Sequence, residues 1–134
     1  QDARRLFEAA ITRNAAEVAT EDDIVSLKIA LDENYKASGN IVEFKRTDVN
    51  FHLSIAKIGN NSVFIALHTA IAEWLSMQRT VSLRVPGVEK KAYSYHEKIY
   101  QAIADRNPEA AWKAMNEHLT DVMKMFKKGQ STYG

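Results

Sequence analysis

Glycine and proline are scarce in this chain, and their positions restrict its architecture. Only five glycines and two prolines occur among the 134 residues. They separate segments in which apolar residues recur at every third or fourth position, and no segment sustains the apolar and polar alternation of a β-strand. The pattern predicts an all-α protein, built as an antiparallel bundle of about six helices joined by short loops.

The limits of the expected helices follow from capping residues at the ends of the periodic segments. Thr20 and Asn40 precede such segments as N-caps, and Asn107-Pro108 places proline at the first position of the last helix. Gly129 is expected to end that helix. The expected helices cover residues 3–19, 21–39, 41–59, 62–83, 88–106 and 108–128, giving one domain over 1–128 and a flexible tail over 129–134.

Charge balance and the absence of cysteine exclude several functions. Eighteen Lys and Arg against 17 Asp and Glu give a formal net charge of +1 without a basic cluster, so this chain by itself is not expected to bind DNA. Without cysteine, any metal must be held by histidines and carboxylates. The longest mostly apolar stretch, residues 63–75, is interrupted by His68 and Glu73, so we expect a soluble chain with no membrane partner. A helical pattern from the first residues, without an initial Met, predicts that an N-terminal neighbour is missing.

Three of the four histidines fall on the apolar faces of three different predicted helices. His52 lies three residues before Ile55, while His96 and His118 are flanked at helical spacing by aromatic or apolar residues. Asp48 lies four residues before His52, so the two side chains project from one face of a helix. The four residues predicted to hold one divalent metal ion are Asp48, His52, His96 and His118.

Two interpretations of this set stay open from the residues alone. Buried imidazoles and a buried carboxylate can pair with one another and with the backbone, or they can share a divalent cation. Three imidazoles and one carboxylate suit Zn, which is the expected ion, and also Ni, Mn or Fe. His68 lies between Phe64 and Ile71 without a carboxylate at helical spacing, so we expect it to pack beside the site and not to bind the ion.

These residues also form an ordered series of motifs. The chain contains D-x-x-x-H followed by I-A and a Gly-Asn turn over residues 48–60, H-x-x-I-x-x-A-I-A over 96–104, A-A-x-x-A-M-x-x-H-L over 110–119, and R-R-L-F-E over 4–8. The series resembles the FadR C-terminal (FCD) domain of GntR-type bacterial transcription regulators. One departure is Asn61, where proline is common in the family. The resemblance implies an all-helical effector-binding domain, a metal held by the four matching residues, and a preceding winged-helix DNA-binding domain that is absent here.

The resemblance further implies an effector, which in the family is typically a small organic acid lying over the metal and held by arginines. By periodicity the candidates in this chain are Arg4, on one stripe with Phe7 and Ile11, and Arg79, eight residues after Ile71. Either arginine could instead extend its guanidinium to solvent. The expected effector is a small organic acid or a sugar acid.

Taken together, the residues and the resemblance predict a ligand-sensing regulatory domain and no enzyme. It would bind a small carboxylate metabolite at the metal, form a homodimer in the cytoplasm, and reach operator DNA only through the missing domain. One alternative is a helical metallohydrolase using the same site, against which the sequence offers no spare inward carboxylate as a general base. The other is a metal with a structural role only.

Overall fold

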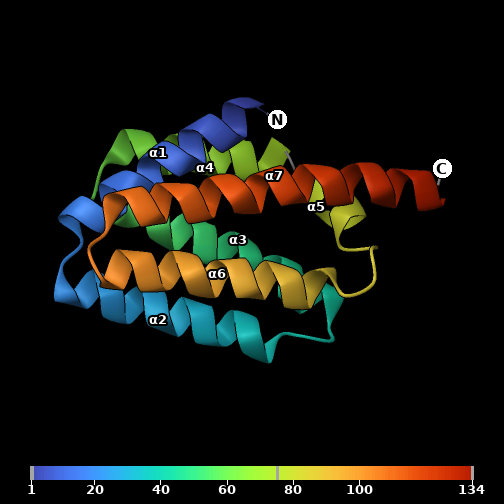
Figure 1. Cartoon of the computed structure of the whole chain (residues 1–134), viewed down its shortest axis with the longest axis horizontal. Helices are drawn as coiled ribbons and strands as arrows, with labels where there is room; N and C mark the ends of the chain where they lie inside the picture. The colour runs from blue at the N-terminus through green and yellow to red at the C-terminus, as the bar shows by residue number, and fades with distance from the viewer. Residues whose placement is uncertain (1, 75, 134) are drawn as a thin grey trace.

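A computed structural model describes the backbone over residues 2–74 and 76–133, and the side chains over 2–73, 76 and 79–130. The described residues form seven helices and no strand, which confirms the all-α prediction (Figure 1). In chain order these are α1 (Asp2–Val18), α2 (Glu21–Lys36), α3 (Ile41–Lys57), α4 (Ser62–Trp74), α5 (Ser76–Ser82), α6 (Val88–Ala104) and α7 (Pro108–Tyr133).

The helix predicted over 62–83 corresponds to α4 and α5, which lie on either side of residue 75, and residue 75 is outside the described residues. The expected inner face of that helix includes Trp74, Leu75 and Gln78, whose side chains lie outside the described residues.

Gly129 does not end the last helix, since α7 continues to Tyr133. A side chain at this position would run into the carbonyl oxygen of Val81, at the end of α5. The glycine therefore lets the two helices approach closely, which is a packing role that sequence alone does not distinguish from a helix stop. The mobility of residues 129–134 stays a prediction.

The N-caps of α2 and α3 are the residues that the sequence predicts. Thr20 accepts a hydrogen bond from the Asp23 backbone N–H, and the Asp23 side chain accepts one from Thr20, which together form a capping box. Asn40 caps α3 through the Glu43 backbone N–H. At Gly59 the backbone has φ of 85° and a side chain would press on Val18, so the α3–α4 turn requires glycine there.

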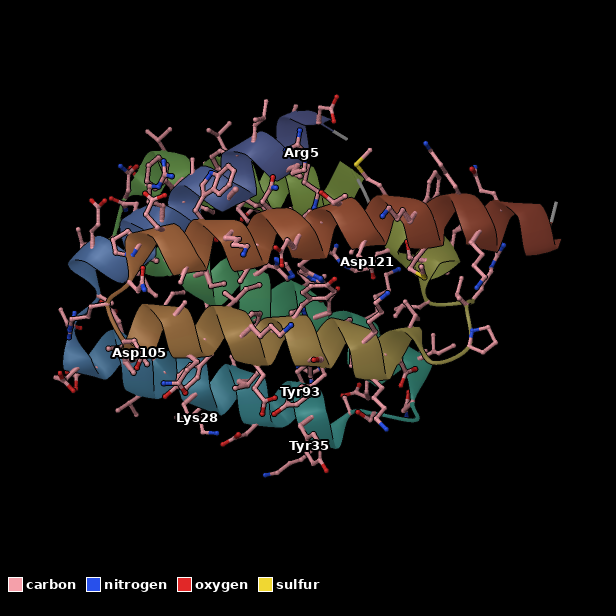
Figure 2. The ribbon with its side chains drawn as sticks, in the orientation of Figure 1. Arg5, Lys28, Tyr35, Tyr93, Asp105 and Asp121 are labelled. Carbon is pink, nitrogen blue, oxygen red and sulfur yellow. The ribbon has the colours of Figure 1, made fainter. Side chains whose placement is uncertain are left out.

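The helices enclose one main apolar core. α7 runs along the bundle and packs against α1 and α6, while α2 packs against α3 and α6 (Figure 1). On the outside of the α2–α6 contact, the rings of Tyr35 and Tyr93 lie 5.1 Å apart (Figure 2). The largest fully buried side chains of the core are Leu27, Leu31, Phe51, Ile55, Ile99, Ile103 and Met115.

A smaller apolar cluster forms near the ends of α3, α5 and α6, from Phe44, Leu83, Val85 and Val88 with Ala37. No helix in the described part of the chain combines the length and hydrophobicity needed to cross a bilayer.

Candidate metal and effector site

The four predicted metal ligands meet inside the bundle. Asp48 and His52 come from α3, His96 from α6 and His118 from α7, and all four are buried. Each offers one ligand atom, and these atoms all lie within 4.8 Å of one another. The side chains therefore form a compact cluster that could bind a metal ion.

The histidines of this cluster present buried nitrogens that no hydrogen bond satisfies within the described residues. These nitrogens are Nε2 of His52, Nε2 of His96 and Nδ1 of His118. Oδ1 of Asp48 lies 3.5 Å from the first and 3.1 Å from the second, without hydrogen-bond geometry in either case. Buried polar atoms are normally paired, and one divalent cation would satisfy all three imidazoles and the carboxylate. The residues present therefore fit a metal ion.

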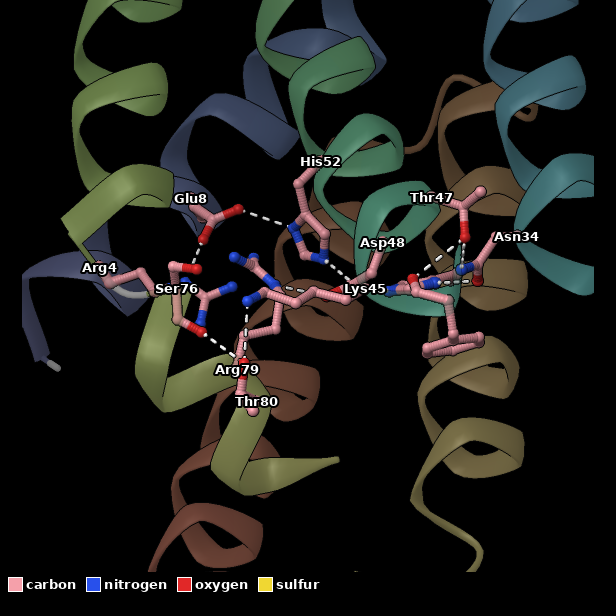
Figure 3. A network of polar contacts seen from close by, with 12 residues as sticks. Arg4, Glu8, Asn34, Lys45, Thr47, Asp48, His52, Ser76, Arg79 and Thr80 are labelled. Atoms are coloured by element: carbon pink, nitrogen blue, oxygen red, sulfur yellow. Dashed lines mark hydrogen bonds and ion pairs between the residues drawn. The ribbon is translucent and has the colours of Figure 1, made fainter. Parts of the chain in front are cut away.

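Asp48 connects the cluster to an arginine. Its Oδ2 accepts a hydrogen bond from Nε of Arg79 at 2.6 Å, and both side chains are buried (Figure 3). Burial by itself would raise the pKa of Asp48, but the charge of Arg79 and contacts from His52 and His96 lower it well below its usual value. The carboxylate is thus held in its ionised form, as a metal ligand must be.

The cluster histidines differ in their protonation. Burial disfavours the charged form of His52, yet Glu8 and Asp48 together raise its pKa above 6.5. For His118, burial and the neighbouring His96 and His52 lower the pKa well below the usual value. For His96, burial is again the largest cause, and the pKa is lowered in spite of Asp48. His96 and His118 are therefore neutral near pH 7 and have lone pairs available.

A small cavity of about 30 Å³ adjoins the cluster, with room for a water molecule or two. Arg4, Asp48, Arg79 and His118 line it, together with apolar residues such as Phe44 and Met125. Asp121 of α7 also lines it and pairs with Lys91 of α6 at 2.9 Å (Figure 2).

Both predicted effector-binding arginines are buried, so neither extends to solvent. Arg79 is 6% exposed, and its Nη1 has no hydrogen-bond partner in the described part of the chain. The same holds for Oγ of Ser82, one turn along α5 and on the wall of the same cavity. Arg4 instead donates from Nε to Oε2 of Glu8 at 2.6 Å. That either arginine binds an effector stays a prediction.

Glu8 is the main residue of the site that the sequence reasoning did not assign. It is 1% exposed, and its Oε1 lies 2.7 Å from Nδ1 of His52 and 3.4 Å from Nε2 of His68. The expectation that no spare carboxylate faces inward is therefore wrong. Its position four residues after the inward Arg4 was the available signal. His68 of α4 is buried beside Glu8 of α1, so its carboxylate partner comes from another helix and not from α4 itself.

Glu8 is nevertheless poorly suited to act as a general base. Burial would raise its pKa, but the charges of Arg4 and His52 and contacts from both histidines lower it well below the usual value. A carboxylate of such low basicity accepts a proton weakly at neutral pH. Glu8 also does not line the cavity.

The fold and the buried cluster agree with one class of protein. A family model described as the FCD domain matches residues 1–121, so this chain belongs to the FCD domain family and the resemblance found in the motifs is confirmed.

Similar proteins are transcriptional repressors. The chain is 36% identical over 121 residues to the HTH-type transcriptional repressor NanR of Cronobacter sakazakii, covering 89% of this chain and 46% of the repressor. It is 36% identical over 138 residues to the HTH-type transcriptional repressor NanR of Salmonella arizonae, covering 96% of this chain and 51% of the repressor. The chain spans about half the length of the curated relatives it matches.

Proposed function

We propose that this chain is the ligand-sensing regulatory domain of a GntR-type transcription regulator. It binds a small carboxylate metabolite at a divalent metal ion held by Asp48, His52, His96 and His118. The observation that carries the proposal is a set of three buried imidazole nitrogens, unpaired among the described residues, and one carboxylate beside a cavity lined by two arginines.

The donor set favours Zn, with Ni, Mn or Fe as further candidates. Three neutral imidazoles and one carboxylate leave a divalent ion with a net positive charge, and such a centre attracts an anion. When bound, the ion supplies a positive centre that an effector carboxylate can contact.

The effector is a small organic acid or sugar acid, held by Arg79 and Arg4. Within the described part of the chain, Nη1 of Arg79 is a buried donor without a partner, and a planar guanidinium matches the two oxygens of a carboxylate. Oγ of Ser82 provides a second free polar atom on the same wall.

Effector binding requires the bundle to open, and this requirement supports a role in signalling. The cavity of about 30 Å³ is far smaller than an organic acid. Because Arg79 and Ser82 both belong to α5, room for the effector comes from displacing α5 relative to α3 and α7. A ligand that binds only the displaced arrangement shifts the population toward it.

The complete regulator acts on operator DNA in the cytoplasm as a homodimer, through the winged-helix domain expected before this chain. A regulator that reads two half-sites is normally two-fold symmetric. Large apolar side chains remain exposed on α1 and α4, at Leu6, Val63 and Leu67, and a second copy of the chain would cover them. The relatives are named as repressors, which supports regulation and not catalysis.

The test is a thermal-shift screen of organic and sugar acids with metal-loaded chain, followed by calorimetric titration of the acid that raises the melting temperature. We expect tight binding to the metal-loaded form and loss of binding after the metal is stripped. Equal affinity for both forms would assign the ion a structural role only. Turnover of esters or phosphoesters by the loaded chain would favour a metallohydrolase.

A further inference from the structure

We propose that Glu8 and the Asn34–Thr47 pair are positioning residues, which fix the rings of His52 and His96 so that both Nε2 lone pairs face the metal site before any ion binds. This inference rests on the proposed function, because it concerns the same metal site. It assigns roles to three buried polar residues on α1, α2 and α3, none of which belongs to the four-ligand cluster.

The orientation of His96 follows from a chain of hydrogen bonds that begins at Thr47. Oγ1 of Thr47 lies 2.9 Å from the Glu43 carbonyl oxygen and 3.1 Å from that of Phe44, so its proton is directed to the α3 backbone. The hydroxyl oxygen then accepts from Nδ2 of Asn34 at 3.0 Å.

The same chain fixes the tautomer of His96. Nδ2 of Asn34 is engaged by Thr47 (Figure 3), and Oδ1 of Asn34 faces Nδ1 of His96 at 2.8 Å. A carbonyl oxygen only accepts, so Nδ1 carries the proton and Nε2 carries the lone pair. That Nε2 lies 3.1 Å from Oδ1 of Asp48, within the cluster.

Glu8 acts on His52 in an analogous way from a different helix. Arg4 pairs with Oε2 of Glu8 at 2.6 Å, which leaves Oε1 to accept from Nδ1 of His52 at 2.7 Å. An ionised carboxylate has no proton to donate, so Nδ1 of His52 is the donor and Nε2 is directed to the site. A carboxylate or carbonyl behind a metal-binding histidine fixes ring orientation, and its loss typically costs about 10–100-fold in metal affinity.

The chain also contains a second group that could be mistaken for a metal site. Ligand atoms of Glu8, His52 and His68 lie within 4.8 Å of one another. In that group Oε1 of Glu8 and Nδ1 of His52 already bond to each other at 2.7 Å, whereas the imidazole nitrogens of the four-ligand cluster are unpaired among the described residues. Positioning of His52 is therefore the role that the contacts of Glu8 support.

Thr47→Val tests the Asn34 arm, because it removes the hydroxyl acceptor while keeping the side-chain shape. The amide of Asn34 is then free to turn its NH₂ toward His96, which favours a proton on Nε2. The matched control is Thr12→Val. Thr12 is also buried and its hydroxyl donates to the backbone carbonyl of Glu8, four residues earlier, so this variant removes a buried hydroxyl without touching the hydrogen bonds of Asn34.

The first measurement is the ¹⁵N chemical shift pattern of the His96 ring in the metal-free chain, which reports the tautomer. We expect the Nδ1-protonated form in the unchanged chain and in Thr12→Val, and a loss of that preference in Thr47→Val. Asn34→Asp, which keeps acceptor oxygens, is expected to retain it. The same tautomer in Thr47→Val as in Thr12→Val would overturn the role of the Asn34–Thr47 pair.

The second measurement is Zn affinity by competition with a chromophoric chelator. Glu8→Gln and Thr47→Val are each expected to weaken binding by about 10–100-fold, with Thr12→Val near the unchanged chain. Affinities equal to that of Thr12→Val would overturn the positioning role. An unchanged chain that binds no Zn would overturn the proposed function instead, while the tautomer measurement without metal still decides the role of Asn34 and Thr47.

Discussion

Replacing Arg79 with Met removes the partner of a buried carboxylate while keeping most of the side-chain volume. Asp48 and Arg79 form an ion pair at 2.6 Å, with the two side chains 11% and 6% exposed. Breaking a buried pair by removing one partner costs about 3–5 kcal/mol, because the other charge is left without compensation. For a chain of this length, about 3 kcal/mol corresponds to a fall of roughly 10 °C in the melting temperature.

A bound metal ion is expected to reduce the loss of stability caused by Arg79→Met. The ion would compensate Asp48 through its other oxygen, so the metal-loaded variant is expected to lose less stability than the metal-free variant. The increase in melting temperature on adding Zn is therefore larger for Arg79→Met than for the unchanged chain, and the Zn affinity rises. Scanning calorimetry with and without Zn measures both differences.

The assay should be repeated over a range of pH, because His52, whose pKa is raised by Glu8 and Asp48, can take up a proton and replace the missing charge beside Asp48. Arg46→Met is the matched control, since Arg46 pairs with Glu43 at the surface and its loss is expected to change the melting temperature little. If metal-free Arg79→Met has the same melting temperature as the metal-free unchanged chain, the ion pair does not stabilise Asp48 and the reasoning is refuted. An equal loss with and without Zn would show that the ion does not contact Asp48.

Further predictions concern the ion, the α5–α7 contact and assembly. His96→Ala should lower both the bound metal per chain and the melting temperature, and a variant that retains one ion per chain by elemental analysis would contradict the ligand set. Gly129→Ala places a methyl group against the backbone of α5 and should destabilise the chain by about 1–3 kcal/mol in urea unfolding; an unchanged midpoint would mean that α5 moves aside freely. Zn affinity should fall as the pH is lowered from about 8 to 6, because the raised pKa of His52 keeps a proton on it to higher pH than on an ordinary histidine, and a flat chelator-competition profile would exclude His52 as a ligand. Sedimentation should find a dimer, and Leu67→Glu should weaken it; a monomeric unchanged chain at high concentration would show that this part of the regulator lacks a sufficient interface.

The sequence predicted those parts of the site that depend on one helix at a time. Helical spacing placed Asp48 and the three histidines on inward faces, because each face has its own apolar neighbours along the same helix. The all-α class followed from the same local pattern.

What sequence could not supply was pairing between helices. Glu8 carries a charge, so by residue type it belongs at the surface, and its burial is explained by contacts with Arg4 of its own helix and with His52 of α3 and His68 of α4. The role of Asn34 and Thr47 depends on their hydrogen bond to each other and on the bond from His96 to Asn34. The three residues belong to three different helices. Gly129 was assigned to a helix end because its neighbour, Val81, is distant in sequence.

The two oxygens of Asp48 face different neighbours, so the response of the proposed sensor would depend on both of them. One oxygen lies beside the imidazoles that would hold the ion, and the other is bonded to the arginine expected to meet the effector. A single carboxylate thus belongs to both binding events, so neither input alone would produce the full response. The domain would then work as a coincidence detector, in which a shortage of metal has the same outcome as a shortage of the metabolite.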